Sequence, residues 1–250
     1  MNKPRPWLYW AVLSVLCLLG VSCCKQQQKD PFRYKVAIIG NPSNPDIRYD
    51  ESQMQALKDL GYNTLQLNIA WGARPADEPL NLEDILYVDG IGSRKKADQR
   101  LQTIKERARI AKKWGFRTLF HFGAPRVDSL YKILTPDLID IATEKNSIQK
   151  KEIVDKYVSL LKRLKQEVPE LDDIEVYTFD QDAWVANEFG NGPTDRDIPL
   201  HERIPAFLQA LTGAWAEVSP DGMVWWEPWE ISAGQIYACI PSLPTRNFGM

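Results

Sequence analysis

The stretch VWWEPWE, residues 224–230, holds three tryptophans and two glutamates. A core strand does not favour carboxylates, and a solvated loop does not favour indole rings. A sugar-binding site uses both, because flat rings stack on pyranose faces and carboxyl groups act on glycosidic bonds. Tryptophan packing also raises the pKa of a carboxyl group, which suits a general acid. We predict Glu227 as catalytic and Trp226, Trp229 and Glu230 as substrate-binding, with a helix-capping role as the alternative for Glu230.

A second group of acids lies in the stretch VYTFDQDAWVANEFG. In an extended chain the side chains of Asp180 and Asp182 point to the same side. Glycoside hydrolysis needs one acid that protonates the leaving oxygen and a second carboxylate that acts as nucleophile or activates water. We therefore predict Asp180 and Asp182 as catalytic beside Glu227, and Trp184 and Glu188 as substrate-binding. Capping of the following loop is the alternative role for Asp180.

Four further polar or aromatic residues follow apolar runs. Asn68 and Trp71 lie in LNIAWG, and His121 and Arg126 lie in FHFGAPR. We predict that all four bind substrate. His121 would donate a hydrogen bond to a sugar hydroxyl, or would instead be a histidine of the core.

Short apolar runs alternate with amphipathic stretches from Tyr34 onward. The predicted strands are 34–40, 63–72, 116–126, 174–180, 223–229 and the segment 247–250. The predicted helices are 50–62, 95–114, 147–166 and 203–218, with a short helix or turn at 231–240. Such alternation predicts a parallel sheet with covering helices. The nearly continuous apolar strands suit a sheet that is buried on both faces.

The candidate residues lie at or just past the C-terminal ends of the predicted strands. A (β/α)8 barrel builds its active site at that edge. The rival fold, a doubly wound nucleotide-binding sheet, would need a GxGxxG turn after its first strand, and this chain has GNPSNPD there. We therefore predict an α/β fold of the (β/α)8 TIM-barrel type. Because about five βα units precede Met250, we expect a truncated barrel.

Residues 1–23 have the pattern of a lipoprotein signal peptide, with basic residues, an apolar run and the ending LLGVSC. The pattern predicts lipidation of Cys23, a short tether at 24–33 and a domain at 34–250. An uncleaved membrane anchor is the alternative, although the apolar run is short for a span. We expect a lipid-anchored protein of the bacterial cell envelope, outside the cytoplasm.

Composition argues against several other functions. The net charge is −2, so no surface for nucleic acid is expected. Of four cysteines, Cys239 alone lies in the predicted domain, which excludes a disulfide framework and a CxxC metal site. We predict no cofactor and no metal. A hydrolase that holds Ca²⁺ or Mg²⁺ through Asp180, Asp182 and Glu227 is an alternative.

The motifs TLQLNIAWG, TLFHFGAPR, VYTFDQDAW and VWWEPWE resemble those of bacterial extracellular TIM-barrel glycoside hydrolases. The resemblance is to the Bacteroidetes type, in which a lipoprotein signal precedes the barrel. The fourth-strand segment and IPLHERIPAFLQAL are also similar to barrels of the α-glucuronidase and β-hexosaminidase type. The resemblance implies exo-acting hydrolysis of a terminal sugar, with Asp180 or Asp182 paired with Glu227. The alternative function is a non-catalytic, glycan-binding surface lipoprotein.

Overall fold

The computed structural model describes residues 32–40, 47–69, 77–126, 147–177, 198–228 and 231–250. Tyr34–Met250 forms one compact unit of the chain, and the structure below concerns that unit. The predictions for the signal peptide and for Cys23 lie outside the described residues.

The centre of this unit is a sheet of six parallel strands in the order β1-β2-β3-β4-β5-β6. The strands are β1 (Val36–Ile38), β2 (Thr64–Gln66), β3 (Arg117–Gly123), β4 (Asp173–Tyr177), β5 (Val224–Glu227) and β6 (Phe248–Gly249). Each strand pairs with the next strand along the chain. A doubly wound sheet reverses its strand order at a switch point, whereas this order is that of a (β/α) barrel. The predicted fold class is confirmed.

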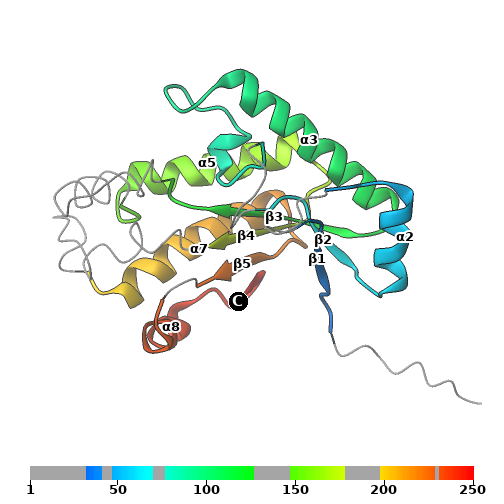
Figure 1. Cartoon of the computed structure of the whole chain (residues 1–250). Helices are drawn as coiled ribbons and strands as arrows, with labels where there is room; N and C mark the ends of the chain where they lie inside the picture. The colour runs from blue at the N-terminus through cyan, green and yellow to red at the C-terminus, as the bar shows by residue number, and fades with distance from the viewer. Residues whose placement is uncertain (1–31, 41–46, 70–76, 127–146, 178–197, 229–230) are drawn as a thin grey trace, which may run out of the picture. The chain divides into compact units, whose positions relative to one another are not determined.

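Helices connect the strands. They are α2 (Glu51–Asp59), α3 (Arg94–Lys113), α5 (Lys151–Glu167), α7 (Leu200–Val218) and α8 (Ala233–Cys239), with the 3-10 turns η1 (Leu82–Asp84) and η3 (Ile240–Ser242). Helix α7 packs against both α5 and α8, and α3 packs against β3 (Figure 1). The predicted helices are all present, with ends shifted by a few residues. Their apolar faces, together with the helix-facing side of the strands, form the hydrophobic core.

Helix α2 shows how local residues set an element's ends. The Asp50 side chain accepts a hydrogen bond of 2.8 Å from the backbone N–H of Gln53, which caps the first turn. Gly61 follows the helix with a φ of 82°, a conformation that favours glycine. Met54 and Leu57 are buried in the core between these ends. The helix predicted over 50–62 is therefore present, and its ends are set by Asp50 and Gly61.

The sheet is strongly curved. In a flat sheet β1 and β5 would lie about 19 Å apart, because neighbouring strands are about 4.8 Å apart. The ring of Tyr34, just before β1, nevertheless lies 5.0 Å from the ring of Trp225 in β5, edge to face. The two strands therefore approach each other across the concave side of the sheet. This curvature gives the sheet an inner face, as in a barrel.

Alternation along β3 divides its side chains between the two faces. Phe120 and Phe122 join the hydrophobic core. His121 lies between them in the chain and so points to the opposite, inner face. Its register partner on β4 is Glu175, which places Glu175 on the inner face as well.

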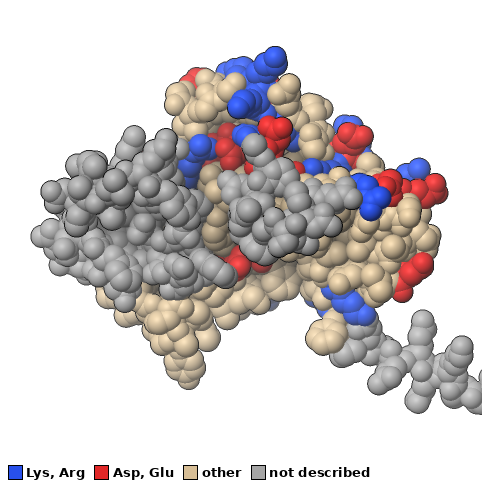
Figure 2. Space-filling view, in the orientation of Figure 1, with Lys and Arg blue, Asp and Glu red and all other residues tan. Residues whose placement is uncertain are grey.

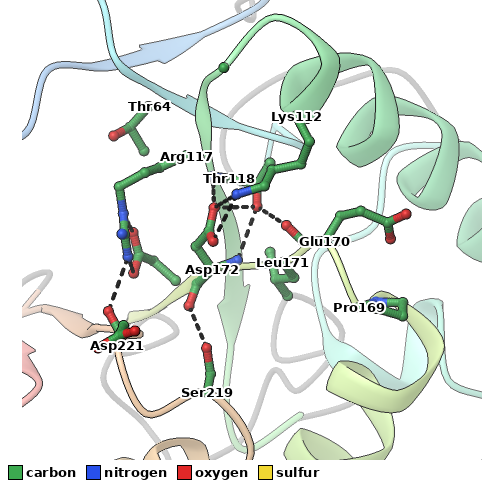
Figure 3. Close-up of polar contacts among 12 residues, drawn as sticks. Thr64, Lys112, Arg117, Thr118, Pro169, Glu170, Leu171, Asp172, Ser219 and Asp221 are labelled. Atoms are coloured by element: carbon green, nitrogen blue, oxygen red, sulfur yellow. Dashed lines mark hydrogen bonds and ion pairs between the residues drawn. The ribbon is translucent and has the colours of Figure 1, made fainter.

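A polar network joins the N-terminal ends of the strands (Figure 3). Lys112 Nζ lies 2.9 Å from Asp172 Oδ2, and the backbone N–H of Thr118 donates to the same oxygen at 2.9 Å. The guanidinium of Arg117 donates two hydrogen bonds, of 2.6 and 3.0 Å, to the buried carboxylate of Asp173. In barrels this edge serves stability, while the opposite edge carries function.

Candidate functional site

Five of the predicted site residues lie within the described part of the chain. They are Asn68, His121, Arg126, Trp226 and Glu227. The remaining predicted residues lie outside the described residues: Trp71, Asp180, Asp182, Trp184, Glu188, Trp229 and Glu230. Their geometry is therefore not part of the site described below.

His121 and Glu227 meet on the inner face of the sheet. Glu227 ends β5 with its side chain 35% exposed, and the side chain of His121 is 3% exposed. The distance from His121 Nε2 to Glu227 Oε2 is 3.0 Å, but the ring N–H does not point along this line. The pair is therefore in ion-pair range without an aligned hydrogen bond. Strand β4 separates β3 from β5, so the contact passes over the inner surface of β4.

Glu175 on β4 lies at this crossing. Its register partners are His121 on β3 and Trp225 on β5. Burial raises the pKa of the Glu175 carboxyl, His121 lowers it, and the negative charge of Glu227 raises it further, with a net upward shift. The strand pairing places His121 and the end of β5, with Glu227, beside Glu175. We call His121, Glu175 and Glu227 the inner cluster.

Glu175 is not among the residues predicted for the site. The predicted residues lie at strand ends, whereas Glu175 lies in the middle of IEVYTFD. The available signal was a carboxylate inside an otherwise apolar strand of a sheet buried on both faces. Because such a group is costly in a core, its presence indicated a polar interior.

Tyr177 adds an aromatic side to the inner cluster. Its ring lies 4.9 Å from the imidazole of His121 at an interplanar angle of 61°. Tyr177 pairs in register with Glu227, and it is largely buried. The His121 ring is thus held between an aromatic edge and a carboxylate, which restricts its orientation.

Asn68 links two strands instead of facing open space. Its side-chain N–H groups donate to the carbonyl oxygens of His121 at 2.8 Å and Pro79 at 3.0 Å. Its side-chain oxygen accepts from the backbone N–H of His121 at 3.1 Å. The amide is 2% exposed. This geometry supports a role in holding β3 and His121, and it gives no support to the predicted contact with substrate.

Arg126 is tied to the segment that precedes α3. Its guanidinium lies 2.8 Å from Asp84 Oδ1, and its backbone N–H donates to the Tyr157 hydroxyl at 2.6 Å. The Tyr157 hydroxyl donates in turn to the buried carboxylate of Glu83 at 2.9 Å. The side chain of Arg126 is 22% exposed. These contacts are internal, which favours a structural role for Arg126 and gives no support to the predicted contact with substrate.

Trp226 lies in the hydrophobic core. It alternates with Trp225 and Glu227 along β5, so its ring faces the helices. The residue is 1% exposed. A ring that stacks on a sugar needs an exposed face, so this placement does not support the predicted contact of Trp226 with substrate.

The remaining observations concern charge, metals and membranes. Acidic and basic side chains are interspersed over the described surface that Figure 2 shows. The described residues contain no group of three or more His, Cys, Asp or Glu side chains placed to hold a metal ion. Within the same described ranges, no helix is both long and apolar enough to cross a membrane.

No protein-family model matches the chain, and no curated protein sequence matches it. Solved structures with a related fold are glycoside hydrolases. The O-GlcNAc hydrolase of Thermobaculum terrenum is 12% identical, with a TM-score of 0.49 over 88% of this chain and 40% of its own. Endo-glycoceramidase II of Rhodococcus sp. is 14% identical, with a TM-score of 0.46 over 77% of this chain and 48% of its own.

A GH5_18 protein of Bifidobacterium longum subsp. longum is 14% identical, with a TM-score of 0.44 over 78% of this chain and 43% of its own. The chain thus spans less than half the length of each of these three proteins. The assignment of this chain to the barrel type rests on its own strand order and curvature.

Proposed function

We propose that this protein is a glycoside hydrolase that acts on extracellular oligo- or polysaccharide, with Glu227 as one of its two working carboxyl groups. The observation that carries the proposal is the inner cluster. The side chain of Glu227 is 35% exposed, stands at the C-terminal end of β5, and lies 3.0 Å from His121. This is the edge at which a barrel presents its reacting groups.

The chemistry of the proposed reaction needs a second carboxyl group within about 5–10 Å of the first. Asp180 and Asp182 follow β4, the strand next to β5, and are the candidates for this role. One of them would protonate the leaving oxygen, while the other member of the pair would act as nucleophile or activate water. The partial exposure of Glu227 and its contact with His121 suit it to either role, that of the acid or that of the nucleophile or base.

The proposed location follows from the N-terminal pattern. Residues 1–23 would direct export, and Cys23 would carry the lipid that anchors the protein to the cell envelope. A carbohydrate substrate outside the cytoplasm is consistent with that location. The prediction is testable by labelling with a radioactive fatty acid in a bacterial host, because Cys23→Ser would abolish the label.

The proposed reaction is tested with the full chain, purified in detergent and offered a panel of aryl glycosides. The panel spans α- and β-linked hexoses, N-acetylhexosamines and uronic acids, and release of the aryl group is followed by absorbance. Quenching of tryptophan fluorescence by free oligosaccharides, measured in parallel, reports binding without turnover.

Hydrolysis of one sugar class supports the proposal. Saturable binding without hydrolysis would contradict it in favour of the non-catalytic glycan-binding protein. Neither binding nor hydrolysis in a protein with a cooperative thermal transition would contradict any carbohydrate function for this chain.

A further inference from the structure

Glu175 has no role in the proposed reaction, yet its position is unusual. A carboxyl group lies in the middle of the parallel sheet, on its inner face, with apolar Ile174 and Val176 on either side facing the core. Removing a carboxylate from water costs free energy unless a partner offsets it. Its register partners on the neighbouring strands are His121 and Trp225, and Glu227 lies two residues beyond Trp225 on β5.

The charged and titratable residues around Glu175 come from three strands. On the described inner face they are His121 and Arg117 of β3, Glu227 of β5, and Asp173 and Tyr177 of β4 itself. Arg117 is engaged by the Asp173 carboxylate at 2.6 Å, at the N-terminal end of the sheet. The opposite charges of Arg117 and Asp173 offset each other, and Asp173 lies two residues before Glu175 along β4. His121 and Glu227 therefore dominate the field at Glu175.

We propose that Glu175 is a positioning residue that stores a proton beneath His121, so that its protonation state sets the charge around Glu227. The inference rests on the proposed function of Glu227. In the active form of the protein Glu175 is protonated and neutral, and His121 interacts with the carboxylate of Glu227 alone. Loss of the Glu175 proton places a second negative charge in the inner cluster and draws His121 away from Glu227.

The geometry supports a shared proton in two ways. His121 Nε2 is 3.0 Å from Glu227 Oε2 without an aligned hydrogen bond, and Nδ1 has no hydrogen-bond partner among the described residues. The ring therefore has a second nitrogen free to respond when the charge on Glu175 changes.

The first test does not depend on hydrolysis. The full chain is labelled with ¹³C at the glutamate carboxyl carbons, and the carboxyl chemical shifts are followed by NMR against pH. The Glu175 signal is assigned by its loss in Glu175→Gln. If that variant does not fold, Glu175→Asp removes the same signal and keeps a carboxylate.

We expect Glu175 to titrate above the ordinary glutamate range, with a midpoint that falls in Glu227→Gln. Glu217→Gln is the matched control, because Glu217 on α7 forms an exposed ion pair with Lys162 of α5. That control should leave the Glu175 midpoint in place. An ordinary midpoint for Glu175, or one that Glu227→Gln does not move, would overturn the inference.

The second test uses the substrate found with the aryl glycoside panel. The pH profile of kcat/KM for the wild type should fall on the alkaline side as Glu175 loses its proton. Glu175→Gln, which cannot ionise, should lack that limb, whereas Glu217→Gln should keep it. An unchanged limb in Glu175→Gln would count against the inference even if Glu227 proves essential. Absence of hydrolysis would contradict the proposed function and leave the NMR titration to decide on Glu175.

Discussion

At the residue scale, the carboxyl groups of this protein differ by their surroundings. Burial alone would raise the pKa of Asp84, but the backbone N–H groups of Leu80 and Asn81 and the charge of Arg126 together lower it. Among the described residues no such set of donors is found at Glu175, and burial together with Glu227 raises its pKa. The two residues should therefore contribute to stability with opposite dependence on pH.

Glu175→Gln is expected to make the protein more stable at neutral pH. A raised folded pKa means that ionised Glu175 opposes folding, fully so above that pKa, and that the penalty vanishes below the ordinary value of 4.5. Gln cannot ionise. The gain in unfolding free energy, measured by urea denaturation at several pH values, should grow from pH 4 to neutral pH. A gain that does not depend on pH would contradict this account.

Asp84→Asn is expected to do the reverse. Because its folded pKa is lowered, the Asp84 carboxylate contributes stability that is present above 3.8 and is lost as the pH falls through the folded pKa. The wild type should therefore exceed Asp84→Asn in stability at neutral pH, and the difference should shrink on acidification below 3.8. Urea denaturation measured at neutral and acidic pH tests this directly. A difference that grows on acidification would show that the carboxylate is not stabilised by its partners.

The same scale shows what the sequence could reveal about the site. Glu227 stood out because a carboxylate among tryptophans is unusual at the end of a strand. The internal role of Asn68 could not be read from type and spacing, because its partners His121 and Pro79 lie on other segments. Trp226 illustrates the same limit, because the face of the sheet to which its ring points depends on the strand register.

At the element scale, the N-terminal ends of the strands are tightly packed. A Cβ atom added at Gly222 would lie 2.4 Å from the carbonyl oxygen of Asp172 and 2.6 Å from the Ser219 hydroxyl oxygen. Both partners belong to the network of Figure 3. The turn before β5 therefore has no room for a side chain.

Gly222→Ala is expected to lower the free energy of unfolding by about 1–3 kcal/mol, because the added methyl group forces backbone atoms apart. Gly213→Ala is the matched control. Gly213 lies in the interior of α7 with nothing within 4 Å of the added Cβ, so the change should stabilise by up to about 1 kcal/mol. Equal effects of the two substitutions in urea denaturation would contradict the packing described for Gly222.

Element existence followed from the sequence better than element ends did. The prediction of helix α2 came close to its observed bounds, because Asp50 and Gly61 at its two ends are local signals. Helix α7 begins at Leu200, three residues before the predicted start at 203. Tertiary packing buries Ile204 and Phe207 along this helix. Because that packing involves segments distant in the chain, the residues of the first turn alone do not indicate where the helix begins.

At the scale of the whole molecule, curvature of the sheet places the site. His121, Glu175 and Glu227 come from three strands, and they meet because the inner face is concave. Strand alternation in the sequence predicted a parallel sheet, but curvature depends on contacts between strands that are far apart in the chain. The contact between Tyr34 and Trp225 is the clearest example of such a long-range contact.

A double-mutant cycle with Tyr34→Ala and Trp225→Ala tests this curvature. We expect a coupling energy of about 0.5–1.5 kcal/mol in urea denaturation, as for other edge-to-face aromatic pairs. Tyr177→Ala combined with Tyr34→Ala serves as a comparison, because Tyr177 packs with His121 and should couple weakly to Tyr34. Zero coupling between Tyr34 and Trp225 would indicate a flatter sheet in solution.

The central claim is that Glu227 works on a glycosidic bond. Its most direct test is kcat/KM on the best aryl glycoside for wild type, Glu227→Gln and the control Glu217→Gln, each as the full chain with its cooperative unfolding verified. We predict a loss of about 10²–10⁴-fold for Glu227→Gln and the wild-type value for Glu217→Gln. Wild-type turnover in a folded Glu227→Gln protein would contradict the account.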